Sequence, residues 1–182
     1  MLPKSTLIDG WVYTEEHMAI CFDISKEKAI NPYEQVYDLS VLLGYYQIKA
    51  PFISSYQSRI IDENRCHTLI NRMVKDRKFV FVNPQARMDI RMKKMQLSDE
   101  EIKCVGIRGL LKKKNKDEGE LACLLRHIRN AIAHGRVFTL NNVGGTDYIL
   151  FDDRGKDDSY SARIVVTKKE LYRWEDLLER AK

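Results

Sequence analysis

Residues 121–134 read LACLLRHIRNAIAH, and this stretch decides the fold because its apolar residues recur at helical spacing. On a helical wheel, which advances by about 100° per residue, five apolar side chains fall on one side. This core stripe consists of Leu121, Leu124, Leu125, Ile128 and Ile132. Gly135 stands where a left-handed C-terminal cap is expected. We therefore predict a helix from about 118 to 134 that packs one face against a core.

The opposite side of the predicted helix is polar, and its members are Cys123, Arg126, His127, Asn130 and His134. A solvated helix face usually mixes Glu, Lys and Gln, whereas residues 121–134 contain no acid, so this face suits an anion better than water. Asn130 and His134 are four residues apart and stack on one face. Arg129 projects from the flank beside Ala122 and Ala133, which are small enough to let another helix approach closely.

Upstream, apolar spacing predicts further helices, while a few positions break the pattern. We expect helices over 14–30, from Tyr33 to just before Pro51, and over 52–77. A fourth helix is expected over 98–113, because Ser98 and Glu101 have the spacing of a capping box. Residues 79–82 are expected to be extended and to lead into a turn at Asn83-Pro84, and 85–96 are basic and ambiguous.

Downstream of Gly135 the period changes from helical to extended. The β-rich runs 137–140, 148–151 and 162–166 predict a small antiparallel meander, and Thr167 with Glu170 forms a capping box that opens a last helix. The predicted fold class is mainly α. It comprises a helical bundle over about 14–135, then a β-meander and a closing helix over about 136–180. With 182 residues, one domain over 1–182 is expected.

The charge of the chain is mild, since 31 Lys and Arg against 26 Asp and Glu give +5, which permits a polyanionic partner without demanding one. Residues 72–116 are the basic part, and they indicate either a solvated surface or a phosphate-binding face. The Lys112–Lys116 run favours a solvated loop over an RNA clamp. Late acidic residues favour a solvated turn over a calcium loop, namely Asp152, Asp153, Asp157 and Asp158.

Several classes of protein are disfavoured by missing signals. No apolar signal segment follows Met1, and no run approaches the roughly 18 apolar residues that span a bilayer. The chain lacks a phosphate-binding glycine loop, and its cysteines form no CxxC pair, which leaves no zinc signature. They are expected to be reduced core residues: Cys21, Cys66, Cys104 and Cys123. We expect a cytoplasmic protein away from membranes, without metal site or cofactor.

Residues 129–136, RNAIAHGR, carry a family resemblance. Arg129 and His134 fit the R-x4-H motif of HEPN ribonucleases, and Asn130 fits the polar residue that usually follows the arginine. The motif ends a late helix, as in that superfamily. The β-strands and final helix that follow resemble a prokaryotic, plasmid-associated HEPN branch. The resemblance covers about 30–175.

The resemblance implies a metal-independent endoribonuclease that dimerises through its motif helix. In that chemistry the ribose 2′-OH attacks the adjacent phosphate and leaves a 2′,3′-cyclic phosphate. His134 suits the role of base, Arg129 the stabilisation of the phosphorane, and Asn130 the holding of the phosphate or of His134. Candidate RNA contacts are Arg126, His127, Arg136, Lys112, Lys113 and Lys114. A role as a toxin or anti-phage defence protein, with a possible antitoxin, also comes from the resemblance.

One position departs from a related toxin branch, in which a tyrosine two residues after the motif histidine is the target of modification by a nucleotidyltransferase. Arg136 stands there, so silencing by that route is not expected. Two alternatives to catalysis stay open. One is a HEPN module that binds RNA or a nucleotide without cutting, and the other is a dimerisation scaffold whose polar face lines a wet interface.

Overall fold

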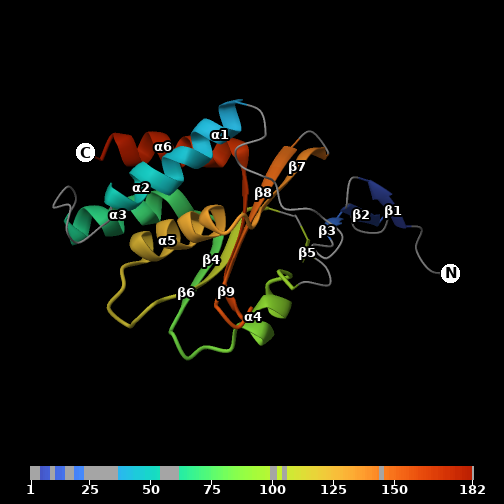
Figure 1. The fold of residues 1–182 in the computed structure, drawn as a ribbon, viewed down its shortest axis with the longest axis horizontal. Coiled ribbons are helices and arrows are strands. Elements are labelled where there is room, and N and C mark those ends of the chain that lie inside the picture. Colours follow the sequence, from blue (N-terminus) through green and yellow to red (C-terminus); the bar gives the residue numbers. More distant parts are fainter. Residues whose placement is uncertain are drawn as a thin grey trace.

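A computed structural model shows how the predicted motif helix is held. The structure describes residues 5–8, 11–14, 19–22, 37–53, 62–98, 102–103, 106–143 and 146–181. The helices are α1 (Tyr37–Gly44), the π-helix η2 (Tyr45–Lys49), α2 (Ala50–Ile53), α3 (Glu63–Val74), α4 (Met88–Lys94), α5 (Glu120–Ala133) and α6 (Lys168–Glu179). Most of them group on one side of a β-sheet, while α4 lies apart from that group (Figure 1).

The sheet has five strands in the order β4-β6-β9-β8-β7. The strands are β4 (Lys78–Val82), β6 (Arg108–Lys112), β7 (Val137–Val143), β8 (Thr146–Arg154) and β9 (Tyr160–Thr167). β4 and β6 are parallel, whereas β6–β9, β9–β8 and β8–β7 are antiparallel. The predicted meander is confirmed as β7, β8 and β9, but two upstream strands extend it.

The prediction of a mainly α fold is therefore wrong, because helices pack on a mixed five-stranded sheet in an α/β arrangement. The error lies largely in the expected helix over 98–113, since residues 108–112 form strand β6. Leu110 packs on the α4 side of the sheet and Leu111 on the α5 side. A strand buried on both faces shows no alternation of apolar and polar residues, so its hydrophobic pattern does not predict a strand.

A second sheet contradicts the helix predicted over 14–30. It has the order β1-β2-β3-β5, with β1 (Ser5–Ile8), β2 (Trp11–Thr14), β3 (Ala19–Phe22) and β5 (Ile102–Lys103). The short apolar run in β3 fits a strand and a buried helical turn equally well, so spacing alone does not separate them. The rest of 14–30, and residues 54–61 of the helix predicted over 52–77, lie outside the described residues.

The helix predicted to end before Pro51 continues through it. The N–H of Ala50 bonds to the carbonyl of Tyr45, five residues back. This wider π-turn precedes Pro51, whose ring would clash with the carbonyl four residues earlier in a regular α-helix. α3 begins later than predicted, at Glu63, because the Asp62 side chain accepts a hydrogen bond from the Arg65 N–H and caps it.

Two hydrophobic cores cover the two faces of the five-stranded sheet. The larger lies between the sheet and the helices α1, η2, α3, α5 and α6, and it includes Ile128, Phe151 and Trp174. The smaller lies under α4 and includes Met92 and Leu110. In the part of the chain that the structure describes, every helix is too short or too polar to span a bilayer.

Candidate active site on the motif helix

Helix α5 is buried on two sides. Its core stripe is confirmed, since Leu121, Leu124 and Ile128 face the larger core. The polar face, which was expected to suit an anion, is not accessible at His127, because only 1% of this residue is exposed. Cys123 on the same face is 0% exposed, which confirms its expected place in the core. The reason is that α5 lies between the sheet and the other helices, with its second face against β6 and β8.

The buried side of α5 is held to the sheet by an ion pair. His127 Nδ1 lies 2.6 Å from Asp153 Oδ2 on β8, and His127 Nε2 lies 2.7 Å from the carbonyl oxygen of Lys112 at the end of β6. Through its two nitrogens the ring thus bridges a carboxylate on β8 and a backbone carbonyl on β6. The pair is desolvated, with 1% and 4% of the two side chains exposed.

The Lys112 carbonyl also accepts from two other α5 side chains. Arg126 Nη2 donates to it at 3.0 Å, and Cys123 Sγ lies 3.7 Å away. The Arg126 guanidinium forms a bidentate pair with Glu118, with distances of 2.7 and 2.8 Å. Burial alone would raise the pKa of Glu118, but hydrogen bonds from Arg126 and from the Lys114 N–H outweigh it and lower that pKa.

The three motif residues lie at the C-terminal end of α5. Asn130 is half-buried, and its Nδ2 donates to Asp153 Oδ2 at 3.2 Å, so one carboxylate oxygen holds both Asn130 and His127. Arg129 and His134 are exposed. Among the described residues, neither of these two side chains has a hydrogen-bond or ion-pair partner. Two cationic or ionisable groups are thus presented beside an anchored amide.

The backbone ends α5 at the motif histidine. His134 is the C-cap residue, and its N–H bonds to the carbonyl of Asn130. Gly135 follows with a φ of 63°, as predicted, and Arg136 donates its N–H to the carbonyl of Ala131. The left-handed turn reverses the chain into β7, so that the Arg136 carbonyl accepts from the N–H of Asp152 on β8.

The Arg136 side chain forms ion pairs with carboxylates on the other face of the sheet. Its Nη2 lies 3.2 Å from Asp152 Oδ2, and its Nη1 lies 3.3 Å from Asp158 Oδ1. The expected solvated turn is wrong for Asp152 and Asp153, which are buried in β8. The signal that sequence reasoning missed is their place in a β-rich run, where a doublet of acids needs buried partners on both faces of the sheet.

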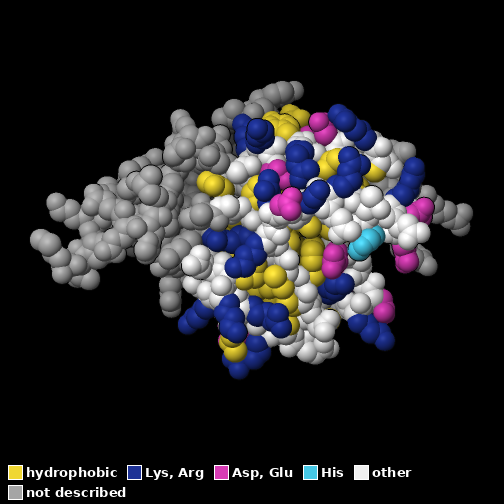
Figure 2. Space-filling model, turned by 180° about the vertical axis from the view of Figure 1, so that it is seen from behind, with side chains coloured by type: hydrophobic (Ala, Val, Ile, Leu, Met, Phe, Trp, Pro, Cys, Tyr) yellow, Lys and Arg dark blue, Asp and Glu magenta, His cyan; other side chains and the backbone are white. Residues whose placement is uncertain are grey.

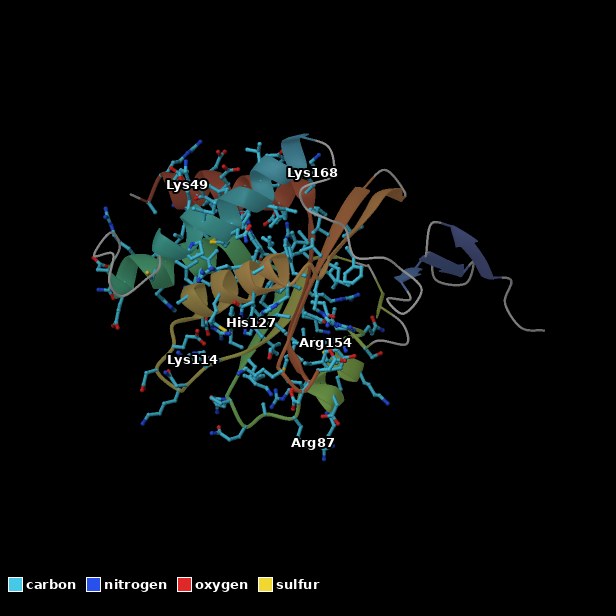
Figure 3. The ribbon with its side chains drawn as sticks, viewed as in Figure 1. Lys49, Arg87, Lys114, His127, Arg154 and Lys168 are labelled. Atoms are coloured by element: carbon cyan, nitrogen blue, oxygen red, sulfur yellow. The ribbon has the colours of Figure 1, made fainter. Side chains whose placement is uncertain are left out.

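The predicted RNA contacts do not form one group. Arg136 follows the motif closely in the chain, whereas Lys113 and Lys114 lie in the loop before α5. Figure 3 shows Lys114 on this loop. Arg126 is held by Glu118, and the ring of His127 is enclosed by protein. The basic segment 72–116 is also divided, because α3 packs with the motif helix and α4 under the opposite face of the sheet. On the face shown in Figure 2, Lys and Arg side chains are spread over the surface with Asp and Glu between some of them.

Within the described residues, no group of three or more His, Cys, Asp or Glu side chains is arranged to hold a metal ion. The arrangement instead combines an exposed guanidinium and an exposed imidazole on one helix end with an amide fixed by a carboxylate.

Comparison with known proteins agrees with the motif. No curated protein and no solved structure matches the chain significantly. The sequence model of one family, HEPN pEK499 p136, matches residues 7–179. That match extends from the first sheet to α6 and includes the whole of α5. The chain therefore belongs to the HEPN pEK499 p136 family.

Proposed function

We propose that this protein is an endoribonuclease that cuts RNA without a metal ion, by attack of a ribose 2′-OH on the adjacent phosphate. The observation that carries the proposal is the presentation of Arg129 and His134, exposed and without partners among the described side chains, at the end of α5. HEPN domains are often ribonucleases, and membership of the family supports the same reading.

In the proposed reaction, His134 takes the proton of the 2′-OH as its oxygen bonds to phosphorus. The bond between phosphorus and the 5′-oxygen breaks, a general acid protonates that oxygen, and a 2′,3′-cyclic phosphate remains. Arg129 offers a planar fork of donors to the oxygens of the phosphorane, whose negative charge grows in the transition state. One N–H of the Asn130 amide is used by Asp153. Its second N–H could donate to a phosphate oxygen, and its oxygen could accept from His134.

The exposed stripe of α5 supports dimerisation through the motif helix. Ala133 and Arg129 are exposed, and Ala122 and Arg126 are half-buried on the same side. Alanines at positions 122 and 133 leave room for the backbone of a second α5 to approach, which would bring two copies of the motif into one cleft. A role as a toxin or anti-phage defence protein, restrained by an antitoxin, is part of the same proposal.

The test is incubation of purified protein with mixed cellular RNA in EDTA, with analysis of the 3′ ends of any fragments. We expect cyclic-phosphate ends from the wild type and at least about a 100-fold loss of rate in His134→Ala and in Arg129→Ala. His67→Ala is the matched control, because His67 is an exposed histidine on α3. DNA lacks the 2′-OH and should stay intact.

The outcomes separate the alternatives. Binding of RNA by the wild type with no cutting would leave a HEPN module that binds without catalysis. A dimer with neither cutting nor salt-dependent RNA affinity would indicate a scaffold. Equal cutting by wild type and His134→Ala would remove His134 from the chemistry. Urea unfolding of both motif variants should match the wild type, because both side chains are exposed.

A further inference from the structure

A second group of charged side chains lies immediately after the motif. The carboxylate of Asp158 bridges two guanidinium groups, with Oδ1 at 3.3 Å from Arg136 Nη1 and Oδ2 at 2.9 Å from Arg154 Nη1. Arg136 is two residues beyond His134 along the chain. A tetrahedral phosphate offers two oxygens in the same way, and arginine forks suit that geometry.

The two arginines are fixed from beneath, independently of Asp158. The buried Asp152 Oδ2 accepts from Arg136 Nη2 at 3.2 Å and from Arg154 Nε at 3.0 Å. Its other oxygen, Oδ1, accepts from Arg163 Nε at 2.8 Å, and Asp152 is 0% exposed. The Arg154 guanidinium also lies over the ring of Tyr160, 4.7 Å from the centroid. The positions of the two guanidiniums therefore do not depend on the bridging carboxylate.

The bridging carboxylate itself is easy to remove. Asp158 lies in the hairpin between β8 and β9, and 67% of its side chain is exposed, against 12% for Arg154 and 34% for Arg136. An exposed ion pair contributes little free energy, because water and salt compete with it. A phosphate of RNA carries at least as much negative charge as the Asp158 carboxylate, so it can compete with Asp158 for the two guanidinium groups.

The geometry points to a phosphate subsite formed by Arg136 and Arg154, in which Asp158 occupies the place of an RNA backbone phosphate until RNA displaces it. We call this pair of guanidiniums the arginine cradle. The inference rests on the proposed function, since it assigns the cradle to a phosphate flanking the scissile one. It also adds Arg154 to the candidate RNA-binding residues and makes Asp158 a competitor of the RNA phosphate.

The test compares two substitutions that change the net charge equally. Asp158→Asn removes the competing carboxylate, and asparagine tolerates the φ of 60° at this position. Asp157→Asn is the control, because Asp157 is the exposed neighbour that bonds to Ser159, and asparagine keeps the accepting oxygen. The probe is a fluorescein-labelled, single-stranded 2′-O-methyl RNA, which presents phosphates but cannot be cut. Fluorescence anisotropy gives the Kd.

We expect Asp158→Asn to lower the Kd about two- to fivefold relative to Asp157→Asn, the range that loss of an exposed ion pair permits. The slope of log K against log[salt] should become shallower by about 0.7 in Arg136→Gln, which removes one phosphate contact to a single strand. In an Arg136→Gln background the effect of Asp158→Asn should disappear. A mononucleotide that displaces the probe at micromolar concentration would instead assign the cradle to a free nucleotide and overturn the RNA subsite.

The results also distinguish this inference from the proposed function. Equal Kd values for Asp158→Asn and Asp157→Asn would overturn the cradle, even if the wild type cuts RNA and leaves cyclic-phosphate ends. A lower Kd for Asp158→Asn than for Asp157→Asn, in a protein that never cuts RNA, would support the arginine cradle and overturn the proposed ribonuclease function. Absence of RNA binding by every variant would overturn both.

Discussion

Replacement of Asp153 by alanine tests whether the buried ion pair holds the motif helix. His127 Nδ1 and Asp153 Oδ2 are 2.6 Å apart, and only 1% and 4% of the side chains are exposed. Removal of one member of such a pair costs about 3–5 kcal/mol, because the other is left buried without its partner. Domains of this size are stable by about 5–15 kcal/mol, so the loss is a large fraction of the total.

Urea unfolding followed by circular dichroism measures this loss as a lower midpoint at unchanged slope. His127→Leu should also destabilise the protein, since the Asn130 amide is then the one side-chain partner that the Asp153 carboxylate keeps among the described residues. The double variant His127→Leu/Asp153→Leu should recover most of the loss, because apolar residues of similar volume replace both charges. Asp176→Ala is the control at an exposed carboxylate and should stay within about 0.5 kcal/mol.

Two results would refute this reasoning. If Asp153→Ala unfolds within about 1 kcal/mol of the wild type, the pair is not a buried ion pair in solution. If the effects of His127→Leu and Asp153→Leu add without coupling in the double variant, His127 and Asp153 act separately. Either result would also remove the argument that Asp153 fixes the amide of Asn130.

Three further predictions follow from the same region. Folding lowers the pKa of Glu118 from 4.5, so the ionised side chain stabilises the protein fully above pH 4.5 and loses this effect as the pH falls through the pKa of the folded state. Urea unfolding should therefore show that Glu118→Gln costs about 1 kcal/mol at pH 7 and nothing in strong acid. Burial raises the pKa of the Cys123 thiol to about 12, so iodoacetamide at pH 8.5 should label it only after unfolding, by peptide mapping. Gly135→Ala should cost about 1–2 kcal/mol from backbone strain alone, because no atom of the described residues lies within 4 Å of the added carbon; an unchanged urea midpoint would contradict that.

The sequence predicted those elements in which one face is apolar and the ends carry local signals. The core stripe of α5, its end at Gly135 and the Thr167 cap of α6 all depend on residues within a few positions of one another. The meander was also predictable, because β-rich runs alternate with turn residues. For these elements local sequence and tertiary packing favour the same structure.

The sequence did not predict elements whose environment is set by distant residues. Strand β6 is covered on both faces, so it lacks the alternation that marks a strand. His127 looks like a solvent-facing residue on a helical wheel, but β6 and β8 bury it by covering a second side of α5. A helical wheel compares the hydrophobicity of the faces of one helix, but it does not show which other elements pack against that helix.

The two adjacent acids of β8, Asp152 and Asp153, hold the chain around the end of α5. Because successive strand residues point to opposite faces of a sheet, Asp153 reaches the α5 side and Asp152 the α4 side. Asp153 holds His127 and Asn130, which precede the helix end, and Asp152 holds Arg136, which follows it. Two adjacent carboxylates thus fix the chain on both sides of His134 while His134 itself stays exposed. In the proposed ribonuclease, this frame would position His134 for catalysis at little conformational cost.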